Sequence, residues 1–337
     1  MVSRSSCKIY NCRWEIFCVW CTDRECDPSR TTEVELADFI LYLLKTKKLS
    51  ISTISGYMSA ISLVRRLNCL SNLLDHLFRA IKLQQAKLPI KSKLPAWNLS
   101  FVLRALTKPP VEPINNALLV HLTWKTSFLL LLASGRRRGE VLSIDIRRIS
   151  WTPRMSSGAS SVTLKPIPGF LPKVLACAEG QPRYVPMTIP SLTNISSEPE
   201  DRLLCPVRAL WHYLKRTETH VRPSNRLFVT VKRGSQAEAS ALTFSAWIKN
   251  LIRFAYEAAP VEARDLANIR VHEVRAIAAS LSIQSNYSLN SILENCSWAT
   301  HSTFSNFYLR DLSAQTGEIF SLGPLVTAGE IIYNPNK

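Results

Sequence analysis

Three short segments carry side chains that could act together on a phosphate. The first, SGRRRGE, places Arg136, Arg137 and Arg138 directly after a long apolar run. The second, VHEVRAIAASL, predicts a helix that presents His272 and Arg275 on the face opposite its apolar residues. Arginine offers a planar fork of donors, and histidine exchanges a proton near neutral pH, so this pair suits an anion such as a phosphate.

The third segment, CSWATHSTFSNFYLRDL, lies near the end of the chain and supplies a candidate nucleophile. On a helix beginning near residue 301, His301, Phe304 and Tyr308 share one face, with Trp298 just before it. Each segment taken singly has an ordinary structural interpretation: a solvated arginine turn, an amphipathic helix and a core tyrosine. It is their order along the chain that favours a shared site.

That order resembles the tyrosine recombinases, the phage-integrase family, in which an arginine motif and an HxxR motif precede a Trp or His and then a C-terminal tyrosine. Gly135, Arg137 and Glu140 fit the spacing of the first motif, HEVR fits the second, and Tyr308 lies where the nucleophile is expected. Segments such as LCPVRALWHYL and the SWATHSTFSNFYLRDL ending are most similar to the recombinases of DIRS-type retrotransposons. The resemblance covers nearly the whole chain.

The resemblance implies a site-specific recombinase or integrase that cleaves and rejoins DNA through a 3′-phosphotyrosine, with no metal and no cofactor. The residues that it assigns to the phosphate are Arg137, His272, Arg275, Trp298 and Tyr308. Trp298 precedes Tyr308 by ten positions rather than the family's more usual nine, so His301 is an alternative to it. The family's catalytic lysine lies on a β-hairpin between the arginine motifs; Lys173 is the first choice and Lys165 the second.

The charge of the chain independently favours a polyanionic partner. Lysine and arginine number 42 against 25 acidic residues, a formal net charge of +17, although a cationic surface can also serve solubility alone. The resemblance implies that this partner is double-stranded DNA, bound by a homo-oligomer, either a dimer or a tetramer. The residues expected to contact DNA are Lys87, Lys91, Lys93, Arg136 and Arg138.

The pattern of apolar residues predicts a mainly α fold with a small β-sheet, an α+β class. Thr32 and Glu35 form a capping box at the start of a helix in an N-terminal helical bundle. The resemblance implies that residues 1–90 are a core-binding (SAM-like) DNA-binding domain and that a catalytic domain, residues 91–337, follows. Its longest predicted helix covers 118–134, and its β-like segments are 161–164, 183–189 and 226–230.

Five of the nine cysteines lie in the first 26 residues. Cys18 and Cys21 have the spacing of a zinc or redox motif, but no second pair follows, and Trp14, Phe17 and Trp20 repeat at helical spacing. Reduced cysteines packed in a helical bundle are therefore expected, without a metal.

The chain shows no secretory signal, and charged or polar residues interrupt its longest apolar run. This run is interpreted as a buried helix rather than a membrane span, and an intracellular location, in the nucleus, is expected. Two other functions stay open: a type IB topoisomerase-like relaxase, and a catalytically inactive DNA-binding protein derived from a mobile element.

Overall fold

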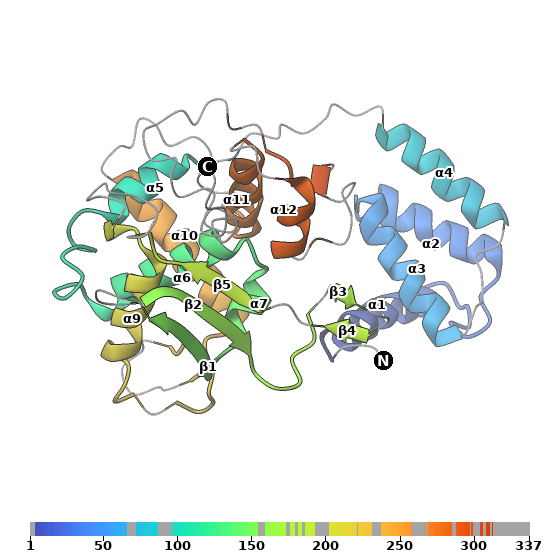
Figure 1. Ribbon diagram of the computed structural model, residues 1–337. Coiled ribbons are helices and arrows are strands. Elements are labelled where there is room, and N and C mark those ends of the chain that lie inside the picture. Colours follow the sequence, from blue (N-terminus) through green and yellow to red (C-terminus); the bar gives the residue numbers. More distant parts are fainter. Residues whose placement is uncertain are drawn as a thin grey trace. The chain divides into compact units, whose positions relative to one another are not determined.

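The computed structural model divides the chain into two compact units, Met1–Ser92 and Lys93–Lys337. It describes residues 4–65, 72–86, 95, 97–153, 159–172, 176–178, 181–183, 186–192, 202–220, 222–230, 237–257, 266, 269–284, 288–296, 298, 304–305, 308–310 and 312. The predicted division at residues 90 and 91 lies outside these residues, and the DNA-binding and catalytic roles given to the two units stay predictions. Helices dominate and the sheet is small, which confirms the α+β class (Figure 1).

The first unit is built from helices that share one apolar core. They are α1 (Arg4–Thr22), α2 (Glu33–Lys45), α3 (Ile51–Arg65) and α4 (Asn72–Ala86). Aromatic rings form the centre of this core: the ring centroids of Phe17 and Phe39 lie 4.9 Å apart, and those of Trp20 and Phe39 5.2 Å apart. Packing of α1 onto α2 therefore depends on these rings, as the helical spacing of the aromatic residues predicts.

Two sets of hydrogen bonds fix the corner between α1 and α2. The predicted capping box is present, since Thr32 N donates to Glu35 Oε2 at 2.6 Å and Glu35 N donates to Thr32 Oγ1 at 3.3 Å. From the end of α3, Arg65 donates to Thr31 Oγ1 at 2.7 Å and to the Thr31 carbonyl at 2.9 Å. The chain between the two helices is thus held by both α2 and α3.

The second unit surrounds a long buried helix. Its helices are α5 (Leu99–Leu106), α6 (Leu119–Ser134), α7 (Arg138–Leu142), α9 (Pro206–Arg216), α10 (Ala241–Glu257), α11 (His272–Gln284) and α12 (Leu289–Asn295). Helix α6 packs against α9, α10 and α11, and all its residues from Leu122 to Ser134 except Trp124 are buried. An apolar surface all around the helix requires such burial. No described helix is both long enough and apolar enough to cross a bilayer.

A three-stranded antiparallel sheet covers part of α6 and α9 (Figure 1). Its strands, in spatial order, are β1 (Ile144–Pro153), β2 (Ala159–Pro166) and β5 (Met187–Pro190). Val162 of β2 pairs with Trp151 on one side and Ile189 on the other, which sets the register. Strands β3 (Ala176–Ala178) and β4 (Gln181–Arg183) form a separate two-stranded sheet.

The predicted strand at 226–230 does not form. Arg226 pairs with Asp145 and Val229 with Glu238, each through an isolated bridge. The segment changes its partner after three residues, so neither pairing extends into a ladder. Its β-branched and aromatic side chains are buried instead by α10, as the contact between Phe228 and Phe244 shows.

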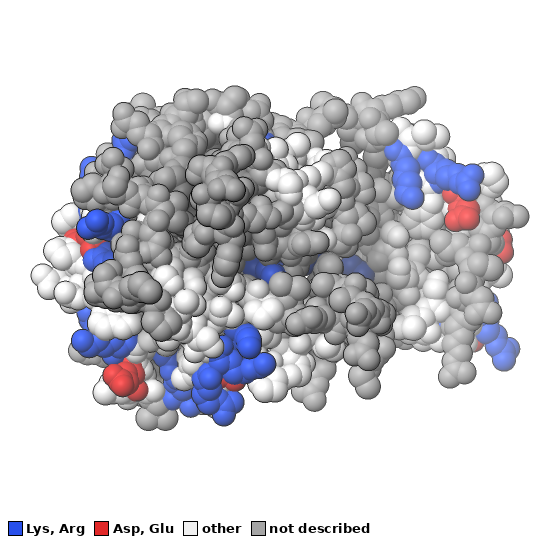
Figure 2. Space-filling view, viewed as in Figure 1, with Lys and Arg blue, Asp and Glu red and all other residues white. Residues whose placement is uncertain are grey.

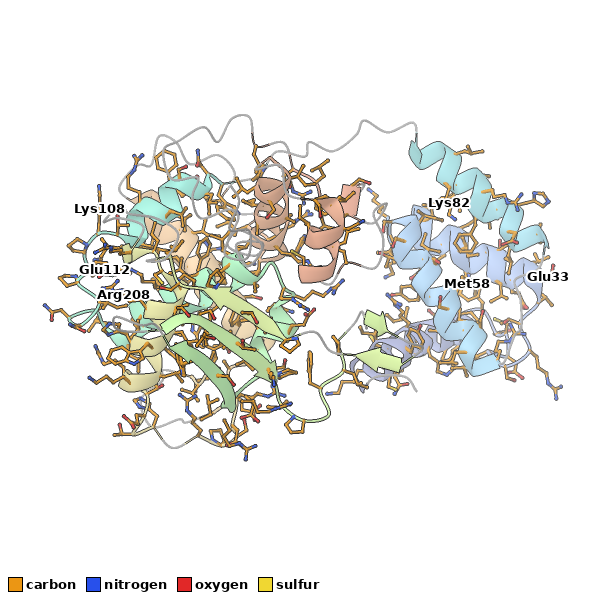
Figure 3. All side chains as sticks on the ribbon, in the orientation of Figure 1. Glu33, Met58, Lys82, Lys108, Glu112 and Arg208 are labelled. Carbon is orange, nitrogen blue, oxygen red and sulfur yellow. The ribbon has the colours of Figure 1, made fainter. Side chains whose placement is uncertain are left out.

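A buried ion cluster lies where α6 meets α9. Lys125 of α6 is fully buried, donates to the Leu106 carbonyl at 2.9 Å and pairs with Glu112. Arg208 of α9 donates to both oxygens of the same carboxylate, from Nη1 to Oε1 at 2.8 Å and from Nη2 to Oε2 at 3.2 Å; Glu112 and Arg208 lie together in Figure 3. Burial lowers the pKa of Lys125 to about 8, although the carboxylate acts in the opposite direction.

Candidate active site

The site begins where α6 ends. Gly135 takes the left-handed conformation (φ 57°), and its N–H caps the carbonyls of Leu131 and Leu132. Residues with a Cβ adopt this conformation only at a cost, so glycine is favoured at this position. The turn directs the following arginines away from the core helix and into α7.

One buried carboxylate orients two of these arginines. Glu140 is 1% exposed, and it accepts from Nη1 of Arg136 at 3.3 Å and from Nη1 of Arg137 at 3.4 Å. Arg136 is itself only 3% exposed, whereas Arg137 is part-exposed. The geometry gives Arg136 a supporting position inside the protein, and its predicted DNA contact stays a prediction.

Helix α11 supplies the second arginine and the histidine. Its Val274, Ile277 and Ala278 are buried in the core, as their spacing predicts. His272, the first residue of the helix, is exposed, but Arg275 is 3% exposed and donates from Nη2 to the Cys296 carbonyl at 2.7 Å. Arg275 is therefore buried rather than solvent-exposed, because Cys296 and Trp298 cover it.

A tryptophan links both arginines to the tyrosine. The Arg275 guanidinium carbon lies 3.7 Å from the Trp298 ring centroid, and that of Arg137 lies 5.8 Å away. The Trp298 and Tyr308 ring centroids are 4.0 Å apart, in an edge-to-face arrangement. Trp298 is buried, and its Nε1 has no hydrogen-bond partner within the described part of the chain. It contacts its neighbours through the ring.

These elements surround a cavity of about 600 Å³. Its charged and polar lining consists of Arg136, Arg137, Arg138, Ser245, Lys249, Arg270, His272, Arg275 and Tyr308. Five arginines and one lysine thus face it, and no aspartate or glutamate is among the described residues that line it. A single phosphodiester carries one negative charge, so the cavity has more positive charge than one such group neutralises. It fits a polyanion.

The charges around the cavity act on its titratable groups. Partial burial lowers the pKa of His272, and the positive charges of Arg270, Arg310 and Arg138 lower it further. The imidazole is therefore neutral at neutral pH and able to accept a proton. Burial and the nearby Arg137 lower the pKa of Arg275 to about 10, which leaves its guanidinium charged under the same conditions.

Two of the lining cations come from positions that no sequence motif marks. Lys249 lies on α10, where it shares a face with Ser245, to whose hydroxyl Arg138 donates. Arg270 precedes His272 by two residues. The proximity of Arg270 to the HxxR motif was a usable signal, whereas only the fold brings α10 next to α7.

Several predicted residues lie elsewhere. Lys173, His301 and the linker lysines, Lys87, Lys91 and Lys93, lie outside the described residues. Lys165 is half-buried on β2, and it is not among the residues that line the cavity. The identity of the general acid thus stays a prediction. Among the described residues, no group of three or more His, Cys, Asp or Glu side chains could hold a metal ion.

Lysine and arginine side chains also outnumber acidic ones on the described surface drawn in Figure 2. Strand β1 contributes Arg147 and Arg148, both exposed. The surplus of positive charge therefore extends beyond the cavity to the described surface.

No protein-family model and no curated protein matches the chain. Among solved structures it is similar to the XerA recombinase, with 14% sequence identity, 93% of this chain and 90% of that chain covered, and a TM-score of 0.41. It is also similar to the XerH site-specific recombinase bound to its difH substrate in a pre-cleavage complex. The sequence identity is 19%, the match covers 85% of this chain and 69% of that chain, and the TM-score is 0.48. Superpositions at this level establish no common function.

Proposed function

We propose that this protein cleaves and rejoins DNA through a covalent bond between Tyr308 and a phosphate, as a tyrosine recombinase does. The observation that carries the proposal is the convergence of Arg137, His272, Arg275 and Tyr308 on one cavity that no described carboxylate lines. A nucleophile, a neutral base and two charged donors lie around a space that fits the phosphates of a DNA strand.

The two arginines would meet the main electrostatic demand of the reaction. Attack on a phosphodiester spreads negative charge over the non-bridging oxygens, and fixed donors lower the barrier if they already point to those oxygens. Arg275 is fixed by the Cys296 carbonyl and the Trp298 ring, and Arg137 by Glu140. Neither guanidinium has to reorganise when the charge develops.

In the proposed step, the Tyr308 oxygen forms a bond to phosphorus as the bond from phosphorus to the 5′ oxygen breaks. His272 takes the phenolic proton, for which its lowered pKa leaves it in the neutral form. The departing 5′ oxygen receives a proton from a lysine, with Lys173 the first candidate and Lys165 the second. The product is a 3′-phosphotyrosine and a free 5′ hydroxyl.

Trp298 takes a positioning role in this scheme. Its ring lies between Arg275 and Tyr308 and does not line the cavity among the described residues. It would keep the nucleophile at a fixed distance from the guanidinium rather than donate to the phosphate. A contact of the indole N–H with the phosphate, which the family resemblance implies, would require the ring to turn.

Because the phosphotyrosine conserves the energy of the broken bond, a second 5′ hydroxyl can displace Tyr308 without ATP. Joining to a different strand is recombination, and joining to the same strand is relaxation. We place the protein with the recombinases because its motifs are most like those of DIRS-type elements. A homo-oligomer on element DNA in the nucleus belongs to the same proposal.

The experiment is a trap for the covalent intermediate. The protein is incubated with a pooled library of nicked duplexes. After cleavage, the short fragment that carries the new 5′ hydroxyl diffuses away, and the adducts are resolved on a denaturing gel. Wild-type protein should form an adduct whose peptide maps to Tyr308. Tyr308→Phe should form none and keep its DNA affinity, because the ring and its contact with Trp298 remain.

The matched control is Tyr42→Phe, in a ring that packs on Phe39 in the first unit; it should form the adduct normally. An adduct in Tyr308→Phe protein would contradict the proposed nucleophile. No adduct from wild-type protein that binds DNA would favour the inactive, DNA-binding alternative. Relaxation of supercoiled DNA without joining of a labelled strand to a second duplex would favour the relaxase.

A further inference from the structure

The end of α1 folds back so that two cysteines meet. Glu25 has a left-handed backbone (φ 55°), the Cys26 N–H donates to the Cys21 carbonyl at 3.0 Å, and the Glu25 N–H donates to the Thr22 carbonyl at 3.2 Å. This pair of bonds defines a Schellman motif. In this motif the residue that follows the left-handed residue contacts the residue five positions earlier in the chain than itself. These two residues are Cys26 and Cys21.

The side chains follow the backbone. The Cys26 thiol donates to the Cys21 carbonyl oxygen, with Sγ 3.6 Å from it. An apolar contact usually joins these two positions of the motif, and here both side chains are thiols. Cys21 is fully buried beside Phe17 and Trp20, whereas Cys26 is half-buried. One thiol of the pair is open to a small reagent and the other is protected.

We propose that Cys21 and Cys26 form an oxidation site, a dithiol that a hydroperoxide converts into an intramolecular disulfide. First, the Cys26 sulfur attacks the peroxide: a sulfur–oxygen bond forms, the oxygen–oxygen bond breaks, and water leaves as Cys26 becomes a sulfenic acid. Next, the Cys21 sulfur attacks the Cys26 sulfur: the disulfide forms, the sulfur–oxygen bond breaks, and the second water carries away the Cys21 proton. Hydrogen peroxide gains the two electrons that the thiols lose.

The different environments of the two thiols set the rates of these steps. Burial, together with the hydrogen bond to Cys26, raises the pKa of the Cys21 thiol to about 12. Because the thiolate is the attacking form, Cys21 is scarcely available at neutral pH. The raised pKa therefore slows closure of the disulfide, and a 1,3-dione is expected to compete with Cys21 for the sulfenic acid.

The test can be made on the whole chain, because trypsin cleaves between Cys21 and Cys26. Cleavage after Arg13, Arg24 and Arg30 places Cys21 in the peptide 14–24 and Cys26 in the peptide 25–30. After exposure to hydrogen peroxide, blocking of free thiols and digestion without reductant, mass spectrometry should find the two peptides joined with the loss of two hydrogens. Dithiothreitol should separate them.

Matched variants identify the partners. Cys18 lies in the same tryptic peptide as Cys21, so Cys18→Ser should keep the linked peptides and Cys21→Ser should abolish them. Cys26→Ser should abolish both the link and the dione adduct at that peptide, and its substitution at a half-buried position leaves the core intact. Circular dichroism checks that each variant is folded; if Cys21→Ser is not, Cys26→Ser and Cys18→Ser decide the pairing.

Oxidation of the exposed Cys7 and Cys12 provides the internal control for peroxide dose. Absence of the linked peptides at a dose that oxidises these two would overturn the proposal. An internal disulfide between Cys18 and Cys21, seen as the loss of two hydrogens within the peptide 14–24 alone, would overturn it as well. Neither result depends on whether the protein cleaves DNA, so the two proposals are tested separately.

Discussion

The second unit contains two groups of buried cations that differ in how their charge is balanced. Lys125 and Arg208 share Glu112, a carboxylate that is 7% exposed and accepts from both. Around the cavity, by contrast, Arg136 and Arg137 share Glu140, while the charge of Arg275 faces an aromatic ring and a carbonyl. The first group has one positive charge in excess, and its Arg208 is 29% exposed to solvent, whereas the second group has two in excess, and its Arg275 is buried.

The contrast distinguishes a structural cluster from the proposed active site within a single unit. A buried charge that has its counter-charge stabilises the fold only modestly but is costly to break. Cations that lack enough counter-charge destabilise the protein when no ligand is bound. Such clusters are typical of sites where a bound anion supplies the missing negative charge. Substitutions in the first group should therefore lower the stability of the fold, and substitutions in the second group should affect the reaction.

The largest effect on stability is expected at Glu112. Glu112→Ala would leave Lys125 fully buried without its carboxylate, which should lower the free energy of unfolding by about 3–5 kcal/mol. Urea denaturation followed by tryptophan fluorescence measures it. Lys108→Ala, at an exposed position nearby, is the control and should change little. A loss below about 1 kcal/mol would mean that the Glu112 carboxylate does not stabilise the buried lysine in the folded protein.

The next largest effect is expected at Arg275, on the reaction. Arg275→Ala should slow adduct formation by about a hundred- to thousandfold, as expected when one transition-state donor is lost. Gel quantification of the covalent adduct over time provides the rate. Arg147→Ala removes an exposed arginine of β1 and should leave the rate unchanged. If both variants react at the wild-type rate, Arg275 belongs with the structural cluster.

A smaller effect is expected at Lys249, on binding alone. A cation that contacts a phosphate releases counterions, so Lys249→Ala should reduce the slope of log affinity against log salt by about 0.9 for every DNA sequence. Fluorescence anisotropy at several salt concentrations measures the slope. Lys215→Ala, on the exposed face of α9, serves as the comparison. An unchanged slope in Lys249→Ala would place this lysine outside the DNA path.

The smallest effect concerns pH. The proposed cleavage step needs neutral His272, so its rate should rise as pH increases through the pKa of this histidine, which partial burial and Arg270 hold below its usual value. Arg270→Ala removes one positive charge, so the pKa should rise and the acidic limb of the rate profile should move to higher pH. Single-turnover rates across the acidic range provide the profile. A limb that moves to lower pH would contradict the role of Arg270.

Local patterns were enough to predict several of the helices and the fold class, but not the burial of the site residues. The apolar spacing of α6 and the capping box of Thr32 and Glu35 are properties of adjacent residues, and both predictions are confirmed. The burial of Arg275 depends on Cys296 and Trp298, which lie about twenty positions later in the chain. No helical periodicity contains that information.

The same limit applies to the partners of the charged residues. Lys125 interrupts an apolar run, and from the sequence this charge indicated only that the run is not a membrane span. In the structure its counter-charge comes from Glu112, which also pairs with Arg208 of α9. Lys249 reaches the cavity only because α10 packs beside α7. The order of the motifs places Arg137, His272, Arg275 and Tyr308 in one hypothesis, and their catalytic roles stay predictions.

The cavity with its five arginines and one lysine also affects the stability of the protein without a bound anion. A ligand that binds only the folded chain raises its stability by RT ln(1 + [L]/Kd), about 2.7 kcal/mol at a hundredfold excess over Kd. If the proposed DNA substrate occupies this cavity, its binding would also stabilise the folded unit. Protein stripped of DNA should be less resistant to proteases, and sulfate or phosphate should restore part of that resistance by occupying the same charges.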